Sequence, residues 1–148
     1  MRIVLIVFAS LFLFLGLGAS ALLGWRDFKD AKEVASLGED RELVMKMADA
    51  SGMTGMKELT PGKLKAGGAG SLLAAGAALV LFVVMFVKKK VALLAGATCA
   101  LAVIAIVLNP NYQAGEAIAA REFAIVAGVL TILGALCAFG ADKLRKTA

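Results

Sequence analysis

Four long blocks without a charged side chain constrain this sequence more than any other feature. They start at Ile3, Ala66, Val91 and Phe123, and each contains 18 to 22 residues. At about 1.5 Å per helical residue, roughly 20 apolar residues cross the ~30 Å hydrocarbon core of a bilayer. The whole chain is 61% hydrophobic, whereas a soluble domain is usually ~45–50% apolar. The pattern predicts an all-α integral membrane protein, a four-helix bundle with a small extracytoplasmic helical loop domain.

Nearly all charged residues lie between the blocks and divide the chain into segments. The predicted segments are a first transmembrane helix (residues 1–25), an extracytoplasmic amphipathic helical loop (26–65), a second transmembrane helix (66–87), a cytoplasmic turn (88–90), a third transmembrane helix (91–108), a short outer loop (109–122), a fourth transmembrane helix (123–140) and a cytoplasmic tail (141–148). Because the turn has only three residues, we expect the second and third helices to be antiparallel neighbours.

The long loop carries eight basic and eight acidic side chains, a balance typical of a solvated surface. Its apolar residues repeat with helical spacing on two faces. The first face consists of Phe28, Ala31, Val34 and Ala35, and the second of Leu43, Met47 and Ala50. Gly38 and Gly52 follow these faces and are expected to end two short amphipathic helices. Thr60 and Pro61 then predict the N-cap and the first residue of the next helix.

The distribution of basic residues sets the expected orientation of the bundle. With both termini in the cytoplasm, the cytoplasmic segments hold seven basic residues and the outer segments nine. The three consecutive lysines at 88–90 and the basic tail still favour this orientation, because a dense basic cluster is difficult to translocate. Trp25 and Tyr112 then form an aromatic belt at the outer interface. We expect the chain in a plasma or bacterial inner membrane, with cytoplasmic N- and C-termini.

The first block also has features of a signal peptide, the alternative to a permanent first helix. Ala19, Ser20 and Ala21 form an A-x-A-like cleavage site after an apolar run. The run exceeds the roughly 7–15 residues of a usual signal peptide, and a single arginine, Arg2, precedes it. These two properties favour an uncleaved membrane anchor.

Side chains able to perform chemistry are scarce. The sequence has no histidine, and because the four blocks contain no Asp, Glu, Lys or Arg, they lack the usual marks of proton relays and ion pathways. The two cysteines, Cys99 and Cys137, form no C-x-x-C motif, and we expect no disulfide between them. The basic residues behind the +5 net charge form no stripe with aromatics, so we expect no nucleic-acid partner. We predict no enzyme activity, no catalytic residue and no cofactor.

Small residues four positions apart recur in three of the predicted helices. The candidate helix-packing residues are Gly16, Ser20, Gly24, Ala92, Gly96, Ala100, Ala124, Gly128, Gly134 and Ala138. Residues four apart share a helix face, and small side chains there let membrane helices approach closely. The partner helix can belong to the same chain or to another. Residues 66–78 are small on every side, which predicts burial among helices or, less favoured, the lining of a cavity.

The methionines of the long loop are the one candidate metal site. Met45, Met47, Met53 and Met56 have M-x-M and M-x-x-M spacings, and thioethers are soft ligands that select Cu(I). Methionine also fills adaptable hydrophobic surfaces, so packing against the membrane face or binding a partner are the alternatives. Packing is favoured, because no Cys or His joins the cluster.

Taken together, these patterns predict a non-catalytic structural or accessory subunit. We expect membrane lipids as neighbours, and assembly as a homo-oligomer or within a larger membrane complex through small-residue helix faces and the outer loop. One alternative is a channel or transport component with the second transmembrane helix near the pore. The other is extracytoplasmic Cu(I) handling by the loop methionines.

Overall fold

The computed structural model describes residues 1–56, 59–87, 90–113 and 118–146. Its helices are α1 (Arg2–Ser36), the short 3₁₀ helix η1 (Gly38–Asp40), α2 (Arg41–Ala50), α3 (Pro61–Val87), α4 (Val91–Leu108) and α5 (Ala120–Lys146). The only β-type pairing among the described residues is an isolated bridge between Thr54 and Gln113. Four helices, α1, α3, α4 and α5, are long and apolar enough to cross a membrane. The predicted all-α four-helix bundle is therefore confirmed, and its helices indicate an integral membrane protein.

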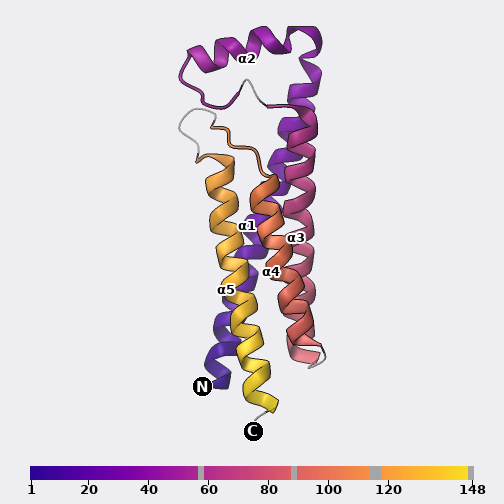
Figure 1. The fold of residues 1–148 in the computed structure, drawn as a ribbon, viewed down its shortest axis with the longest axis vertical. Coiled ribbons are helices and arrows are strands. Elements are labelled where there is room, and N and C mark those ends of the chain that lie inside the picture. The colour runs from indigo at the N-terminus through magenta and orange to yellow at the C-terminus, as the bar shows by residue number, and fades with distance from the viewer. Residues whose placement is uncertain (57–58, 88–89, 114–117, 147–148) are drawn as a thin grey trace.

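The four long helices form a closed ring of neighbours. α1 packs against α3 and α5, and α4 packs against the same two helices, so α1 and α4 lie on a diagonal. Both chain termini lie at one end of the bundle, here named the termini end, and α2 lies across the opposite end, the α2 end (Figure 1). The first and last helices of the chain are therefore in direct contact.

Helix α1 continues well beyond the first charge-free block. Its 35 residues give a length of about 50 Å, which exceeds the ~30 Å hydrocarbon core. The uncharged residues 3–23 suffice to cross the core, so the charged residues from Arg26 onward extend past it. The predicted first transmembrane helix and the first short helix of the loop are therefore parts of one continuous helix, whose inward face stays packed throughout. Leu23, Ala31 and Val34 keep that face buried to the end of α1.

Helix α2 buries a different face from the predicted one. Leu43 and Met47 are exposed, whereas Met45 is only 4% exposed and belongs to a buried cluster with Val34 and Leu59. The reason is that α2 lies across the bundle, so the end of α1 and the chain entering α3 determine which side is covered. The second amphipathic face was therefore assigned to the wrong side of this helix.

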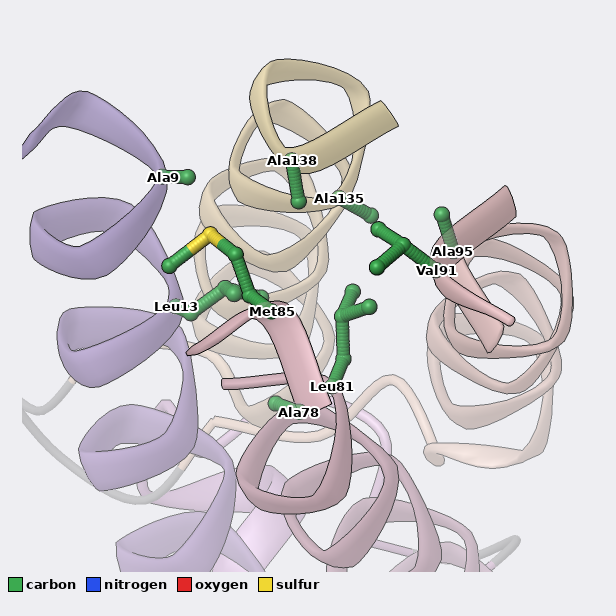
Figure 2. Close-up of a cluster of buried hydrophobic side chains, with 9 residues drawn as sticks. All are labelled: Ala9, Leu13, Ala78, Leu81, Met85, Val91, Ala95, Ala135 and Ala138. Atoms are coloured by element: carbon green, nitrogen blue, oxygen red, sulfur yellow. The ribbon is translucent and has the colours of Figure 1, made fainter. Parts of the chain in front are cut away.

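A second buried cluster holds the termini end together, and all four long helices contribute to it. Figure 2 shows its side chains meeting between the helices. Its members are Ala9, Leu13, Ala78, Leu81, Met85, Val91, Ala95, Ala135 and Ala138. Only three of the nine, Leu13, Leu81 and Met85, are larger than valine, so the helices approach closely around a few bulky side chains.

The ends of the remaining helices follow local signals. Helix α4 has the bounds expected for the third block. Helix α3 starts at Pro61, and the Lys63 backbone N–H donates to Thr60 Oγ1 at 3.2 Å, as the N-cap prediction requires. Helix α5 runs on into the expected tail, where the buried Asp142 pairs with Arg145 at 3.1 Å and Lys146 at 3.0 Å.

Candidate functional site

The most unusual group in the described structure is a carboxylate at the α2 end. Asp27 projects from α1, is 0% exposed, and neither of its oxygens has a hydrogen-bond partner. It lies beyond the charge-free residues 3–23, at the level where the first turns of α3 begin. Burial raises the pKa of the Asp27 carboxyl to about 7, against the lowering effect of the neighbouring Arg26. A buried acid without a donor is costly as an anion, so this group differs from a structural ion pair.

Gly67 on α3 creates the space that Asp27 occupies. A Cβ atom at Gly67 would lie 3.2 Å from Asp27 Oδ2, 3.2 Å from Pro110 Cδ and 3.3 Å from Asn109 Cα. The carboxyl of α1, the backbone of α3 and the turn that ends α4 therefore meet at one point. Any side chain at Gly67 would separate them.

Asn109, the C-cap of α4, is the second buried polar side chain at this point. It is 3% exposed, and its Nδ2 donates to Ala105 O at 2.9 Å and to Ser71 Oγ at 3.0 Å. The carbonyl of Ala105 can only accept, so it fixes which end of the amide is nitrogen. Asn109 Oδ1 is consequently an acceptor, and it has no partner. We name Asp27, Ser71 and Asn109 the α2-end polar cluster.

A partly exposed network lies next to this cluster. The Tyr112 hydroxyl donates to Asp30 Oδ2, and Arg26 Nε lies 3.7 Å from the same oxygen. The Arg26 guanidinium also lies over the Tyr112 ring, 5.5 Å from its centroid. Burial, and then the hydrogen bond to Asp30, raise the pKa of the Tyr112 hydroxyl. The network attaches the segment after α4 to the extension of α1.

A cavity of about 390 Å³ opens beside Asn109. Lys63 from α3 and Arg121 from α5 line it, together with Pro110 and Asn111. The charged side chains that line this cavity are therefore both basic.

Sequence reasoning missed the buried position of Asp27 because it placed residues 26–65 in a solvated loop. A usable signal was present in the spacing. Gly16, Ser20, Gly24, Asp27 and Ala31 follow one another at intervals of three or four, and all are buried on one face of α1. Extending the phase of the packing face past Trp25 would have predicted that Asp27 points inward.

The small residues proposed for packing in α1 and α5 lie inside the bundle. Those buried are Gly16, Ser20, Gly24, Ala124, Gly128, Gly134 and Ala138. A Cβ at Gly16 would lie 2.4 Å from Thr131 Oγ1, and one at Gly134 would lie 2.8 Å from the backbone nitrogen of Leu13. Gly16 on α1 faces α5, and Gly134 on α5 faces α1 about one turn away. The two helices are therefore in backbone contact.

The small residues proposed for α4 lie on its outer face instead. Ala92, Gly96 and Ala100 are exposed, and a Cβ at Gly96 meets no described atom within 4 Å. The contacts of α4 within the chain use other residues. The buried positions are Val91, Ala95, Thr98, Ala102 and Ala105. Whether a second chain covers the outer stripe stays a prediction.

The small half of α3 lies where other helices come close. A Cβ at Gly68 would lie 3.0 Å from the Phe28 ring and 3.1 Å from Gly24 O, both on α1. On the side facing α4, a Cβ at Gly70 would lie 3.2 Å from Leu108. These contacts favour the interpretation that the small residues permit packing, not that they line a cavity.

The four loop methionines do not share one surface. Met45 is buried, Met47 is 64% exposed, and both belong to α2. Residues two apart on a helix point in different directions, so the M-x-M pair cannot present both sulfurs to one ion while α2 is helical. Met56 packs against the cluster that contains Met45, and Met53 is half-buried. The arrangement favours packing.

Three of the hydroxyls within the apolar helices donate to carbonyls of their own helix. Ser10 donates to Ile6 O at 2.8 Å, Thr98 to Leu94 O at 2.8 Å and Thr131 to Ala127 O at 2.9 Å. This is the usual arrangement for an isolated hydroxyl in a membrane helix. Cys99 and Cys137 are free thiols packed against the cluster at the termini end.

Comparison with protein families, curated proteins and solved structures finds no match to this chain.

Proposed function

We propose that this chain is a non-catalytic membrane subunit that assembles with a second copy of itself through the lipid-facing side of α3 and α4. The observation that carries the proposal is a groove of about 420 Å³ between these helices. Its lining residues are Leu72, Leu73, Gly76, Ala77, Val80, Leu94, Ala97, Thr98 and Leu101. We name this surface, with Gly96 at its edge, the α3–α4 face.

The shape of the α3–α4 face supports association between helices. A Cβ at Gly76 or at Gly96 meets no described atom within 4 Å, so both positions are open notches. Leu73 and Leu94 also belong to this face. The Leu73 side chain is mostly exposed, and the Leu94 side chain is partly exposed. In lipid, close packing of backbones at small residues drives helix association, because lipid tails already satisfy apolar side chains.

The α3–α4 face is complementary to the same face of a second copy of the chain. It carries both notches and leucine ridges, so the ridge of one copy can enter the notch of the other around a two-fold axis. The lining of the groove includes no charged side chain, so two such faces meet without burying a charge. Termini and α2 of both copies would then lie on matching sides of the membrane.

We further propose a cell-membrane location with the termini and the 88–90 turn in the cytoplasm and α2 outside. The basic residues of the turn and of the end of α5 support this orientation. A fluorescent protein fused after Ala148 should fluoresce in the cytoplasm, and alkaline phosphatase inserted at Gly52 should be active. An inactive phosphatase in a well-expressed fusion would contradict the orientation without affecting the assembly proposal.

Copy number in nanodiscs, measured by native mass spectrometry or by counting photobleaching steps, tests the assembly. Gly76→Leu and Gly96→Leu should convert dimers to monomers, because the added side chain fills a notch while leaving the single chain folded. Gly18→Leu is the matched control, since a Cβ there also meets no described atom within 4 Å but lies on α1, away from the face.

Monomeric wild type, or dimers that survive both leucine substitutions, would contradict the proposal. Loss of dimer in Gly18→Leu as well would place the contact elsewhere. A different protein retained at one copy per chain would replace the second copy as the occupant.

A further inference from the structure

Three buried acceptor atoms at the α2 end lack any donor. They are Asp27 Oδ1, Asp27 Oδ2 and Asn109 Oδ1, and they are the only buried side-chain nitrogen or oxygen atoms without a partner in residues 1–56, 59–87, 90–113 and 118–146. All three belong to side chains that are at most 3% exposed. Both residues lie against Gly67, Asp27 through its Oδ2 and Asn109 through its Cα, so the three atoms belong to one junction of α1, α3 and α4.

No described neighbour of Asp27 donates a hydrogen bond to its carboxylate. The polar atom of the Asn109 amide that lacks a partner is its oxygen, because the nitrogen donates to Ala105 O and Ser71 Oγ. Arg26, the adjacent cation on α1, is directed to Asp30 and lies over the Tyr112 ring. Gly67, the contact on α3, supplies no side chain. An unpaired carboxylate in such a site is strongly disfavoured, and a carboxyl in this position normally neutralises itself.

We propose that Asp27 is a proton-binding site, in which the neutral carboxyl donates its hydrogen to the amide oxygen of Asn109. One proton, taken from the aqueous phase, gives Asp27 a donor and gives Asn109 Oδ1 a partner. The resulting bond joins α1 to the end of α4 across the diagonal of the bundle. Loss of the proton leaves three buried acceptors without a donor at the junction of α1, α3 and α4, which loosens the α2 end.

The charged groups around the site favour a proton over a metal ion. On α1 these are Arg26 and Asp30, and Tyr112 faces them from the segment after α4. Lys63 of α3 and Arg121 of α5 line the cavity through which Asn109 is reached. Three cationic side chains therefore oppose two acidic ones near the site. A proton bound within a covalent O–H bond tolerates this field better than a metal ion held by three oxygens.

Infrared spectroscopy of the full chain in dodecyl maltoside, a detergent without carbonyl groups, tests the proposal directly. At about pH 6, exposed Asp and Glu side chains are ionised, so a remaining neutral-carboxyl C=O band reports a buried acid. We expect this band in the wild type, with loss as pH rises through about 7. The band should be absent in Asp27→Asn and retained in Asp142→Asn, the matched control in the other buried aspartate, which is paired with Arg145 and Lys146.

A second variant reports on the acceptor and does not depend on the folding of Asp27→Asn. Asn109→Ala should lower the midpoint of the band by about one pH unit, since it removes the hydrogen bond that stabilises the neutral acid. A role of Asn109 in structure alone would leave the midpoint in place. Absence of the band in the wild type at about pH 6 would overturn the proposal, as would its persistence in a folded Asp27→Asn. A midpoint that falls when NaCl or CaCl₂ is added would show that a metal ion takes the proton's place.

Discussion

The contact between α1 and α5 allows a sharp test, because two glycines on one helix have opposite surroundings. A Cβ at Gly16 would lie 2.4 Å from Thr131 Oγ1, 2.9 Å from the Thr131 backbone nitrogen and 3.1 Å from its Cα. The hydroxyl is held by Ala127 O, and the backbone atoms cannot rotate away. A Cβ at Gly18, only two residues later, meets no described atom within 4 Å.

We expect Gly16→Ala to be less stable than Gly18→Ala by about 1–3 kcal/mol, the usual cost of adding a methyl group to a packed contact. Alanine is a better helix former than glycine by ~1 kcal/mol, but both variants gain this amount and the comparison cancels it. Gly134→Ala should cost a similar amount, because its Cβ would lie 2.8 Å from the backbone nitrogen of Leu13. The double variant Gly16→Ala/Gly134→Ala should cost less than the sum, since the first methyl already separates the helices.

Unfolding by sodium dodecyl sulfate in mixed micelles, followed by circular dichroism and by the fluorescence of Trp25, measures these differences. Trp25 is the only tryptophan and lies on α1. Equal stability of Gly16→Ala and Gly18→Ala would refute the reasoning, because it would mean that the two helices are not in backbone contact at Thr131.

Three further predictions concern the α2 end. Relative to Asp27→Asn, the wild type should lose roughly 4 kcal/mol of stability as pH rises from about 4 to about 7. The reason is that burial raises the Asp27 pKa from 3.8 to about 7, so in this range the folded state alone keeps the proton. Parallel pH profiles of the two unfolding free energies would contradict this. Tyr112→Phe should cost about 1.5–3 kcal/mol through loss of the hydrogen bond to Asp30, measured by the same unfolding, and no change would mean that the bond is exchanged for water. Met45→Ala should cost about 2–5 kcal/mol and Met47→Ala almost nothing, since the first is 4% and the second 64% exposed; equal effects would contradict the orientation of α2.

The number and approximate extent of the long helices could be predicted because charge marks where a chain leaves the hydrocarbon core. Residues 88–90 and the Asn109–Pro110 turn enclose α4 on both sides, so its bounds were accessible from sequence. The length of α1 could not be predicted in this way. The charged residues after Trp25 mark where the helix passes from lipid into water, but the helical backbone hydrogen bonds continue across that boundary. A composition boundary was mistaken for a structural one.

Which face of a helix packs inward could be predicted from the sequence only in part. In α4, small residues occur on both sides, with Ala92, Gly96 and Ala100 outward and Ala95 and Ala102 inward. Spacing alone cannot choose between two equivalent stripes, since the choice is made by the positions of α3 and α5. The burial of Asp27 depends on the same three-dimensional information, namely the absence of a side chain at Gly67 and the turn at Asn109.

The pairing of the first helix with the last one has a consequence for how the protein is made. During synthesis α1 leaves the ribosome first, whereas Thr131, which covers Gly16, is translated more than a hundred residues later. The α3–α4 hairpin can form as soon as its two helices are inserted, because they are joined by a short turn. The side of α1 that packs on α5 has to wait, turned to lipid or to the insertion machinery, until α5 enters the membrane. Ribosomes stalled within the segment before Ala120 should therefore hold a protease-sensitive chain, and protection should appear in one step when α5 is released.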